Sequence, residues 1–277
     1  MLALAALPAG AQARSAQPIR TAAYASGNGF FEEYPGGPAA VLLLHENGEG
    51  WRSVSGAAES LQRAGYTVLD LEWEGVEERV GSEVWEPLTT EIEDAVRYAV
   101  AHAHQLGIDP TRLAMVGGSR GANLATLTAE DMDAASPGTI KAVVALSADV
   151  NPIAQLDRAE TAIAHGEPPN EKVEMKFART YGCESELRSC PRAYIERWSP
   201  YDKVIGPHGA TAPPMLLAAS LEERYTANWE DQPPMAEALE HRGVGAVVLR
   251  PQSGHGFSYM GSIRRSVLAF LAEHDRS

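Results

Sequence analysis

A serine flanked by glycines is the residue whose surroundings most clearly suggest chemistry. Ser119 lies in Gly117-Gly118-Ser119-Arg120-Gly121, after an apolar run at 113–116 and before a helix-forming segment. This order predicts a strand, a sharp turn and a helix, with the serine at the turn. Such a turn strains the backbone and exposes the hydroxyl at the edge of a sheet. The five-residue pattern alone is common, so Ser119 is predicted to be a nucleophile only if the chain supplies partners.

A serine hydroxyl needs an adjacent base, because it is a poor nucleophile at neutral pH. His255 is the best-placed histidine: it lies in Ser-Gly-His-Gly-Phe (253–257), directly after the last expected strand at 246–249. Parallel sheets place their chemistry in the loops that follow strand ends. We therefore expect His255 beside Ser119. His45 is expected to shape its own loop, and His102 and His104, two apart on a helix, would be a poor metal pair.

The base in turn needs a carboxylate to fix its tautomer and to stabilise the imidazolium. The turn after the expected strand at 215–219 reads Ser-Leu-Glu-Glu-Arg (220–224). Glu223 is the first choice for this acid and Glu222 the second. Asp202 and Asp231 remain candidates outside this turn.

A tetrahedral intermediate also needs hydrogen-bond donors for its oxyanion. The backbone N–H of Arg120, directly after the serine, is expected to be one donor. The second is expected from the loop His-Glu-Asn-Gly (45–48), which follows a buried strand. There the backbone N–H of Glu46 or of Asn47 would point at the oxyanion.

The elements that must position these residues alternate between strands and helices. Short apolar runs predict buried strands at 41–44, 66–71, 113–116, 141–147, 215–219 and 246–249. Helical patterns are expected at 53–63, 122–132, 231–242 and 261–274, and in a long helix capped by Thr89 or Thr90 that ends before Gly107. The alternation predicts the α/β class, with a mostly parallel sheet covered by helices on both faces.

One segment departs from this alternation and is expected to form an insertion. Residues 149–212 are rich in proline and hold both cysteines of the chain, Cys183 and Cys190. Insertions of this kind commonly cover an active site, so we expect an inserted lid within a single domain at 14–277. The cysteines, with six residues between them, favour a small disulfide-closed loop in an oxidising compartment; two free thiols are the alternative.

The first residues and the composition indicate in which compartment, and with which partners, the protein is expected to act. Residues 1–13 are apolar and end in Ala-Gln-Ala, which resembles the core and cleavage site of a secretory signal peptide without its basic start. An alanine-rich N-terminus without this role is the alternative. We expect a secreted or periplasmic protein. The net charge of −14 gives nucleic-acid binding no support, and no run is long enough to span a bilayer.

These motifs together resemble the α/β-hydrolase superfamily, in its carboxylesterase and dienelactone-hydrolase-like branches. The order of Ser119, acid and His255 matches the nucleophile–acid–histidine order of that family. The loop at 45–48 resembles the family's His-Gly-Gly-Gly loop, with Glu46 and Asn47 in place of glycines. The resemblance covers roughly residues 38–271. The serine–arginine pair at 119–120 also locally resembles glucuronoyl esterases, in which the arginine assists the oxyanion; a structural Arg120 paired with an acidic loop is the alternative.

The resemblance implies a serine hydrolase that cleaves small carboxylic esters through an acyl-enzyme, without metal or cofactor. A peptidase or amidase with the same triad is one alternative, since both use the same acyl-enzyme chemistry. A non-catalytic binding protein on the same fold is another, because fold does not fix function. The oligomeric state is not indicated by the sequence.

Overall fold

The computed structural model of the chain describes residues 20–23, 29–73, 85–168, 170–181, 183, 190–206, 211–223 and 229–275. The expected signal peptide at 1–13 lies outside the described residues. So does most of the acidic stretch at 71–87.

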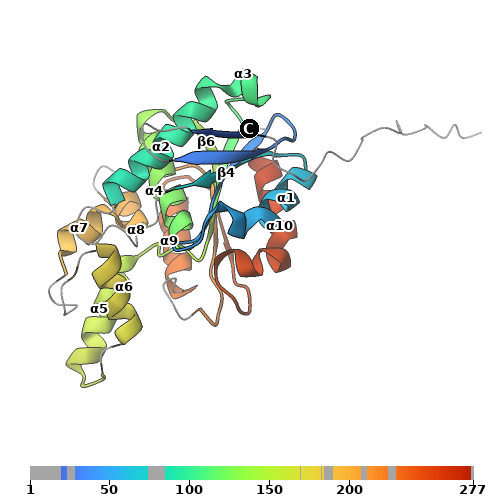
Figure 1. The fold of residues 1–277 in the computed structure, drawn as a ribbon. Helices are drawn as coiled ribbons and strands as arrows, with labels where there is room; N and C mark the ends of the chain where they lie inside the picture. Colours follow the sequence, from blue (N-terminus) through green and yellow to red (C-terminus); the bar gives the residue numbers. More distant parts are fainter. Residues whose placement is uncertain are drawn as a thin grey trace, which may run out of the picture.

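The described strands form one twisted sheet at the centre of the molecule (Figure 1). Its spatial order is β1-β2-β4-β3-β5-β6-β7-β8. The strands are β1 (Arg20–Ala23), β2 (Phe30–Tyr34), β3 (Ala40–Leu44), β4 (Thr67–Glu72), β5 (Leu113–Gly118), β6 (Ile140–Leu146), β7 (Met215–Ala218) and β8 (Ala246–Leu249). From β4 to β8 along this order all neighbours are parallel, whereas β1 pairs antiparallel with β2 and β2 with β4. The expected α/β class with a mostly parallel sheet is confirmed.

Helices cover both faces of the sheet (Figure 1). One face carries α2 (Trp85–Ala101), α3 (Ala103–Leu106), α4 (Arg120–Ala135) and α9 (Gln232–His241), which begins after the short 3-10 helix η4 (Trp229–Asp231). The other face carries α1 (Ser55–Arg63), which follows the 3-10 helix η1 (Trp51–Val54), and α10 (Met260–His274), which follows η5 (Gly256–Tyr259).

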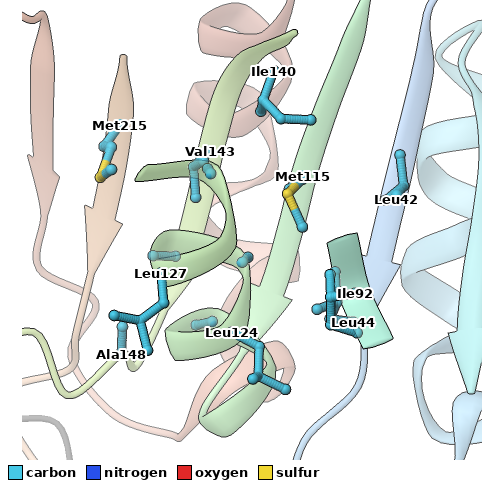
Figure 2. Packing of buried hydrophobic residues seen from close by; sticks show 14 of the residues in the cluster. Leu42, Leu44, Ile92, Met115, Leu124, Leu127, Ile140, Val143, Ala148 and Met215 are labelled. Carbon is cyan, nitrogen blue, oxygen red and sulfur yellow. The ribbon is translucent and has the colours of Figure 1, made fainter. Parts of the chain in front are cut away.

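The strands β3 and β5 carry no polar side chain, because both faces of the sheet are covered there. In β3, Leu42 and Leu44 pack into the core under α2 and α4, and the alternate residues Val41 and Leu43 pack into the core under α1 and α10. Figure 2 shows Leu124 and Leu127 of α4 in the same core cluster as Leu42 and Leu44 of β3. Each fully buried leucine stabilises the fold by about 1.5–3 kcal/mol. The central strands are therefore fixed supports for the loops that follow them.

The regular elements in the described part of the insertion between β6 and β7 are all helices. They are α5 (Pro152–Ala164), α6 (Glu171–Tyr181), α7 (Arg192–Arg197) and α8 (Pro200–Ile205). The side chain of Asn151 caps α5 and that of Ser199 caps α8, each followed by a proline at the first helical position. Cys183 and Cys190 form a disulfide between α6 and α7. The pair α5 and α6 extends beyond the sheet at the lower left of Figure 1.

The expectation that Thr89 or Thr90 caps the long helix is wrong. The helix begins at Trp85, and both threonines lie inside it with their hydroxyls donating to carbonyls of the preceding turn, Thr90 to Glu86 O at 2.8 Å. Trp85 and Leu88 are buried, so tertiary packing favours the extra turn over a threonine cap. The helix also breaks at His102, before the short α3 that ends at a left-handed Gly107.

No helix among the described residues is long and apolar enough to cross a membrane. Nor do three or more of their histidine, cysteine, aspartate or glutamate side chains gather so that they could hold a metal ion.

Candidate active site

Ser119 occupies a strained turn between β5 and α4. Its φ of 52° and ψ of −118° lie in a region that non-glycine residues rarely adopt, at a cost of about 1–3 kcal/mol. The neighbouring glycines allow this turn. A Cβ on Gly117 would overlap the backbone of Gly121, and a Cβ on Gly121 would lie 2.6 Å from the carbonyl oxygen of Leu44. The turn therefore holds the serine at the carboxyl end of a central strand, as its sequence pattern predicts.

His255 and Glu223 form a hydrogen-bonded pair at the same edge of the sheet. The Nδ1 atom of His255 lies 2.8 Å from Oε2 of Glu223, whose side chain is only 1% exposed. The two residues come from the loops after β8 and β7. Burial by itself lowers the pKa of His255, but the hydrogen bond and charge of Glu223, with the charges of Glu46 and Glu49, outweigh it and raise the pKa above its usual value. The pair can therefore hold an imidazolium.

The histidine loop also lies directly against the serine turn. A Cβ added to Gly118 would come within 2.6 Å of the Phe257 ring, so the two loops are in van der Waals contact one residue from Ser119 and two from His255. Ser119, Glu223 and His255 follow β5, β7 and β8, so the three residues lie at the same edge of the sheet.

Ser147 and Tyr259 complete the acid's surroundings, and neither was expected from the sequence. The Ser147 hydroxyl lies 2.9 Å from Glu223 Oε2 and accepts the backbone N–H of Gly256 at 2.9 Å. The hydroxyl of Tyr259 lies 2.9 Å from the same serine oxygen and donates to Ala218 O at 2.8 Å. Ser147 also has a positive φ of 56°. Its place at the end of a buried strand was the only signal for it in the sequence.

The loop after β3 lies against the serine turn, where a Cβ on Gly118 would come 3.1 Å from Cγ of Glu46. His45 is buried, stacks on Trp73 with ring centroids 4.7 Å apart, and places Nδ1 2.8 Å from the carbonyl oxygen of Glu46. Burial lowers the pKa of His45. A neutral His45 that donates to this carbonyl fixes the loop from which Glu46 and Asn47 project. The backbone N–H of Arg120 lies in the first turn of α4, where intrahelical acceptors are absent.

The guanidinium of Arg120 points into the insertion. Its Nη2 donates to Thr180 Oγ1 of α6 at 2.7 Å, and its Cζ lies 5.1 Å from the ring centroid of Trp85. Burial lowers the pKa of Arg120 to about 10, and the carboxylate of Asp149 is among the charges that oppose this shift. The Nη1 atom has no hydrogen-bond partner within the described residues. Arg120 therefore links the serine turn to α6 through the hydroxyl of Thr180.

The other carboxylates that the sequence offered point elsewhere. Glu222, the second choice for the acid, is exposed to solvent. Asp231 binds Arg158 through both oxygens, at 2.6 and 2.8 Å. Asp202 lies in the first turn of α8, where its backbone N–H donates to Ser199. Of these candidates, only Glu223 is hydrogen-bonded to His255.

Comparison with known proteins gives a consistent picture of the fold. The model of the BD-FAE family matches residues 44–177. No curated protein matches the sequence. Among solved structures, the chain is similar to the esterase Est2 of the planctomycete Thermogutta terrifontis, with a TM-score of 0.64 at 17% identity over 93% of this chain and 91% of that one.

Two further esterases have the same architecture. The carboxylesterase EstE1 from a metagenomic library superposes with a TM-score of 0.68 at 20% identity, over 94% of this chain and 87% of its own. The hyperthermophilic esterase of the archaeon Pyrobaculum calidifontis gives 0.66 at 21% identity, over 94% and 85%. The chain thus has the α/β-hydrolase fold, as its sequence motifs implied, and it shares this fold with carboxylesterases.

Proposed function

We propose that the protein is a serine hydrolase of carboxylic esters. The observation that carries the proposal is the bond between His255 Nδ1 and the buried Glu223, next to a serine in a strained turn. The fold shared with several esterases supports it. The substrate is expected to be a small ester, with no metal or other cofactor.

Each residue has a defined task in this mechanism. The Ser119 oxygen attacks the acyl carbon while His255 Nε2 takes the hydroxyl proton, and Glu223 stabilises the imidazolium that results. The N–H of Arg120 and that of Glu46 or Asn47 hold the oxyanion. His255 then protonates the leaving alcohol as the ester C–O bond breaks. In the deacylation step, water attacks the acyl carbon and His255 takes a proton from the water. The bond to Ser119 then breaks, the carboxylic acid leaves, and His255 returns the proton to the Ser119 oxygen.

A fluorophosphonate probe and a short-chain aryl ester test this function. We expect one equivalent of probe on Ser119, and we expect Ser119→Ala to lose both labelling and turnover while circular dichroism shows an unchanged fold. Full ester turnover by Ser119→Ala would refute the mechanism. Absence of both labelling and turnover in the unaltered protein would instead favour a non-catalytic binding protein.

An amidase or peptidase would use the same residues, so paired substrates separate it from an esterase. We expect an aryl ester to be cleaved far faster than the anilide with the same acyl group. Comparable kcat/KM values on the two substrates would assign the protein to the amidase class instead. A series of acyl chain lengths would then define the acyl group that fits under the insertion.

We also propose that the protein is exported. The disulfide between Cys183 and Cys190 supports this, because such bonds persist in oxidising compartments. The test is the mass of the protein recovered from the periplasm or medium after expression in a Gram-negative host. Cleavage after residue 13 is the expected result, and retention of the intact leader in the cytoplasm would contradict it.

A further inference from the structure

The side chain of Glu46 lies on the far side of the histidine from Glu223. Its Oε2 is 3.9 Å from Nε2 of His255, and its Oε1 accepts the backbone N–H of Phe257 at 2.8 Å. The side chain is 17% exposed, so this carboxylate is largely removed from water. The contact spans the two ends of the chain, because Glu46 follows β3 and Phe257 follows β8.

The surrounding loops leave room for this carboxylate because two glycines lie next to it. A Cβ on Gly118 would lie 3.1 Å from Cγ of Glu46, and a Cβ on Gly256 would overlap its carboxylate. The serine turn, the histidine loop and the loop after β3 therefore close around the Glu46 side chain. A residue with a side chain at either glycine would displace it.

His255 consequently has a carboxylate at each ring nitrogen. Glu223 is hydrogen-bonded to Nδ1, and Glu46 faces Nε2, the nitrogen that exchanges the proton with Ser119 in the proposed mechanism. Glu49, exposed on the same loop as Glu46, adds a weaker negative charge. The neutral Tyr259 hydroxyl of η5 reaches the site through Ser147.

We propose that Glu46 is a positioning residue, whose carboxylate holds the histidine loop through Phe257 N–H and stabilises the protonated form of His255 across Nε2. The inference rests on the proposed hydrolase function, and it concerns the Glu46 side chain, which is separate from the backbone N–H proposed for the oxyanion. A carboxylate 3.9 Å from Nε2 favours the imidazolium that forms when the serine attacks. It also keeps His255 protonated to higher pH and so moves the onset of activity upward.

Opposing effects act on the ionisation of Glu46, and burial, the largest of them, raises its pKa above the ordinary value. The Phe257 N–H and the positive charge of His255 act in the opposite direction. Protonation of His255 therefore favours the charged carboxylate, and the charged carboxylate favours protonated His255. The two groups are expected to act together where His255 titrates.

Substitution of Glu46 by glutamine separates its charge from its hydrogen bond. The amide oxygen of Glu46→Gln can still accept from Phe257, while the negative charge is gone. We expect the acid limb of kcat/KM on a neutral aryl ester to move down by about 1 pH unit, the low end of the effect of an opposite charge at 4–6 Å. Glu46→Asp keeps the charge and should largely retain the original limb. Glu49→Gln, the matched control on the same loop, should move it far less.

A second measurement does not depend on catalysis. The imidazole resonances of His255 can be titrated by NMR in full-length Ser119→Ala and in the same protein with Glu46→Gln added. A lower titration midpoint with the added substitution is the expected result; an unchanged midpoint, or an equal shift from Glu49→Gln, would overturn the proposal. Failure of the hydrolase function would appear separately, as a protein that neither reacts with the probe nor turns over ester.

Discussion

The contribution of the Glu223 charge can be measured by replacing this residue with glutamine. The side chain is buried, and its Oε2 lies 2.8 Å from His255 Nδ1 and 2.9 Å from the Ser147 hydroxyl. Glutamine has nearly the same shape, and its amide oxygen can occupy the position of Oε2. The substitution therefore removes the charge that stabilises the imidazolium and leaves the packing in place.

The expected loss follows from the geometry of the pair. Two unit charges whose centres lie about 4 Å apart attract by about 4 kcal/mol at an effective dielectric constant near 20. A remaining neutral hydrogen bond would offset part of this, which leaves about 2–4 kcal/mol. Because about 1.4 kcal/mol corresponds to a tenfold change in rate, kcat should fall roughly 30- to 1,000-fold. The acid limb of the pH profile should also move to lower pH, since the charge and hydrogen bond of Glu223 help to raise the pKa of His255.

The assay is hydrolysis of a short-chain aryl ester, with Glu222→Gln as the matched control. Glu222 is the exposed neighbour with the same side chain, so its substitution should change kcat by less than about twofold. Thermal unfolding of both variants shows whether the fold is retained. If Glu222→Gln lost as much activity as Glu223→Gln, or if Glu223→Gln retained nearly full activity, the assignment of the acid would be wrong.

Three further substitutions test the surroundings of the site. Ser147→Ala removes a donor to the acid and the acceptor of Gly256 N–H, so kcat should fall about 10- to 100-fold in the same assay, as expected for a hydrogen bond to a charged group. Arg120→Met removes the bond to Thr180 but keeps the backbone N–H, so KM should rise more than kcat falls. Burial, with neighbouring carboxylates, raises the pKa of Asp70 to about 9, so Asp70→Asn should change how urea stability depends on pH.

The sign of the Asp70 effect follows from proton binding. Between its unfolded pKa, near 3.9, and about 9, folded Asp70 holds a proton that the unfolded chain has lost, so stability falls as pH rises. The original protein should lose about 1.4 kcal/mol per pH unit more than Asp70→Asn. Parallel stability curves would contradict this. An unchanged kcat in Ser147→Ala would refute the proposed support of Glu223 by Ser147. A loss of kcat without a rise in KM in Arg120→Met would refute the role proposed for the Arg120 side chain.

The sequence predicted the fold because the information it required is local. Runs such as 41–44 and 113–116 are apolar at every position, and only a strand covered on both faces explains that in a short segment. The strands at 246–249 and 113–118 then placed His255 and Ser119 at one edge, because parallel strands end on the same side. The helix at 85–101 was misplaced at its start, because buried contacts of Trp85 decided where it begins.

The sequence predicted the candidate site only where a residue pattern indicates a particular backbone conformation. The glycines at 117 and 121 predicted the turn at Ser119, because a side chain at either position would overlap the backbone. No residue pattern of this kind distinguishes Glu222 from Glu223. The two residues are identical and adjacent, and the turn that carries them directs one to His255 and the other to solvent.

The alternation of strands and helices, the serine turn and the histidine that follows the last strand were thus predicted from the sequence itself, since local sterics and hydrophobic patterns indicate them. The tertiary structure decided the acid, the Ser147 hydroxyl beside it, the direction of the Arg120 guanidinium and the carboxylate of Glu46 across Nε2. The physical reason is that a loop side chain has no periodicity to reveal its direction. Contacts with residues far along the chain set it, and these exist only once the loops have assembled at the edge of the sheet.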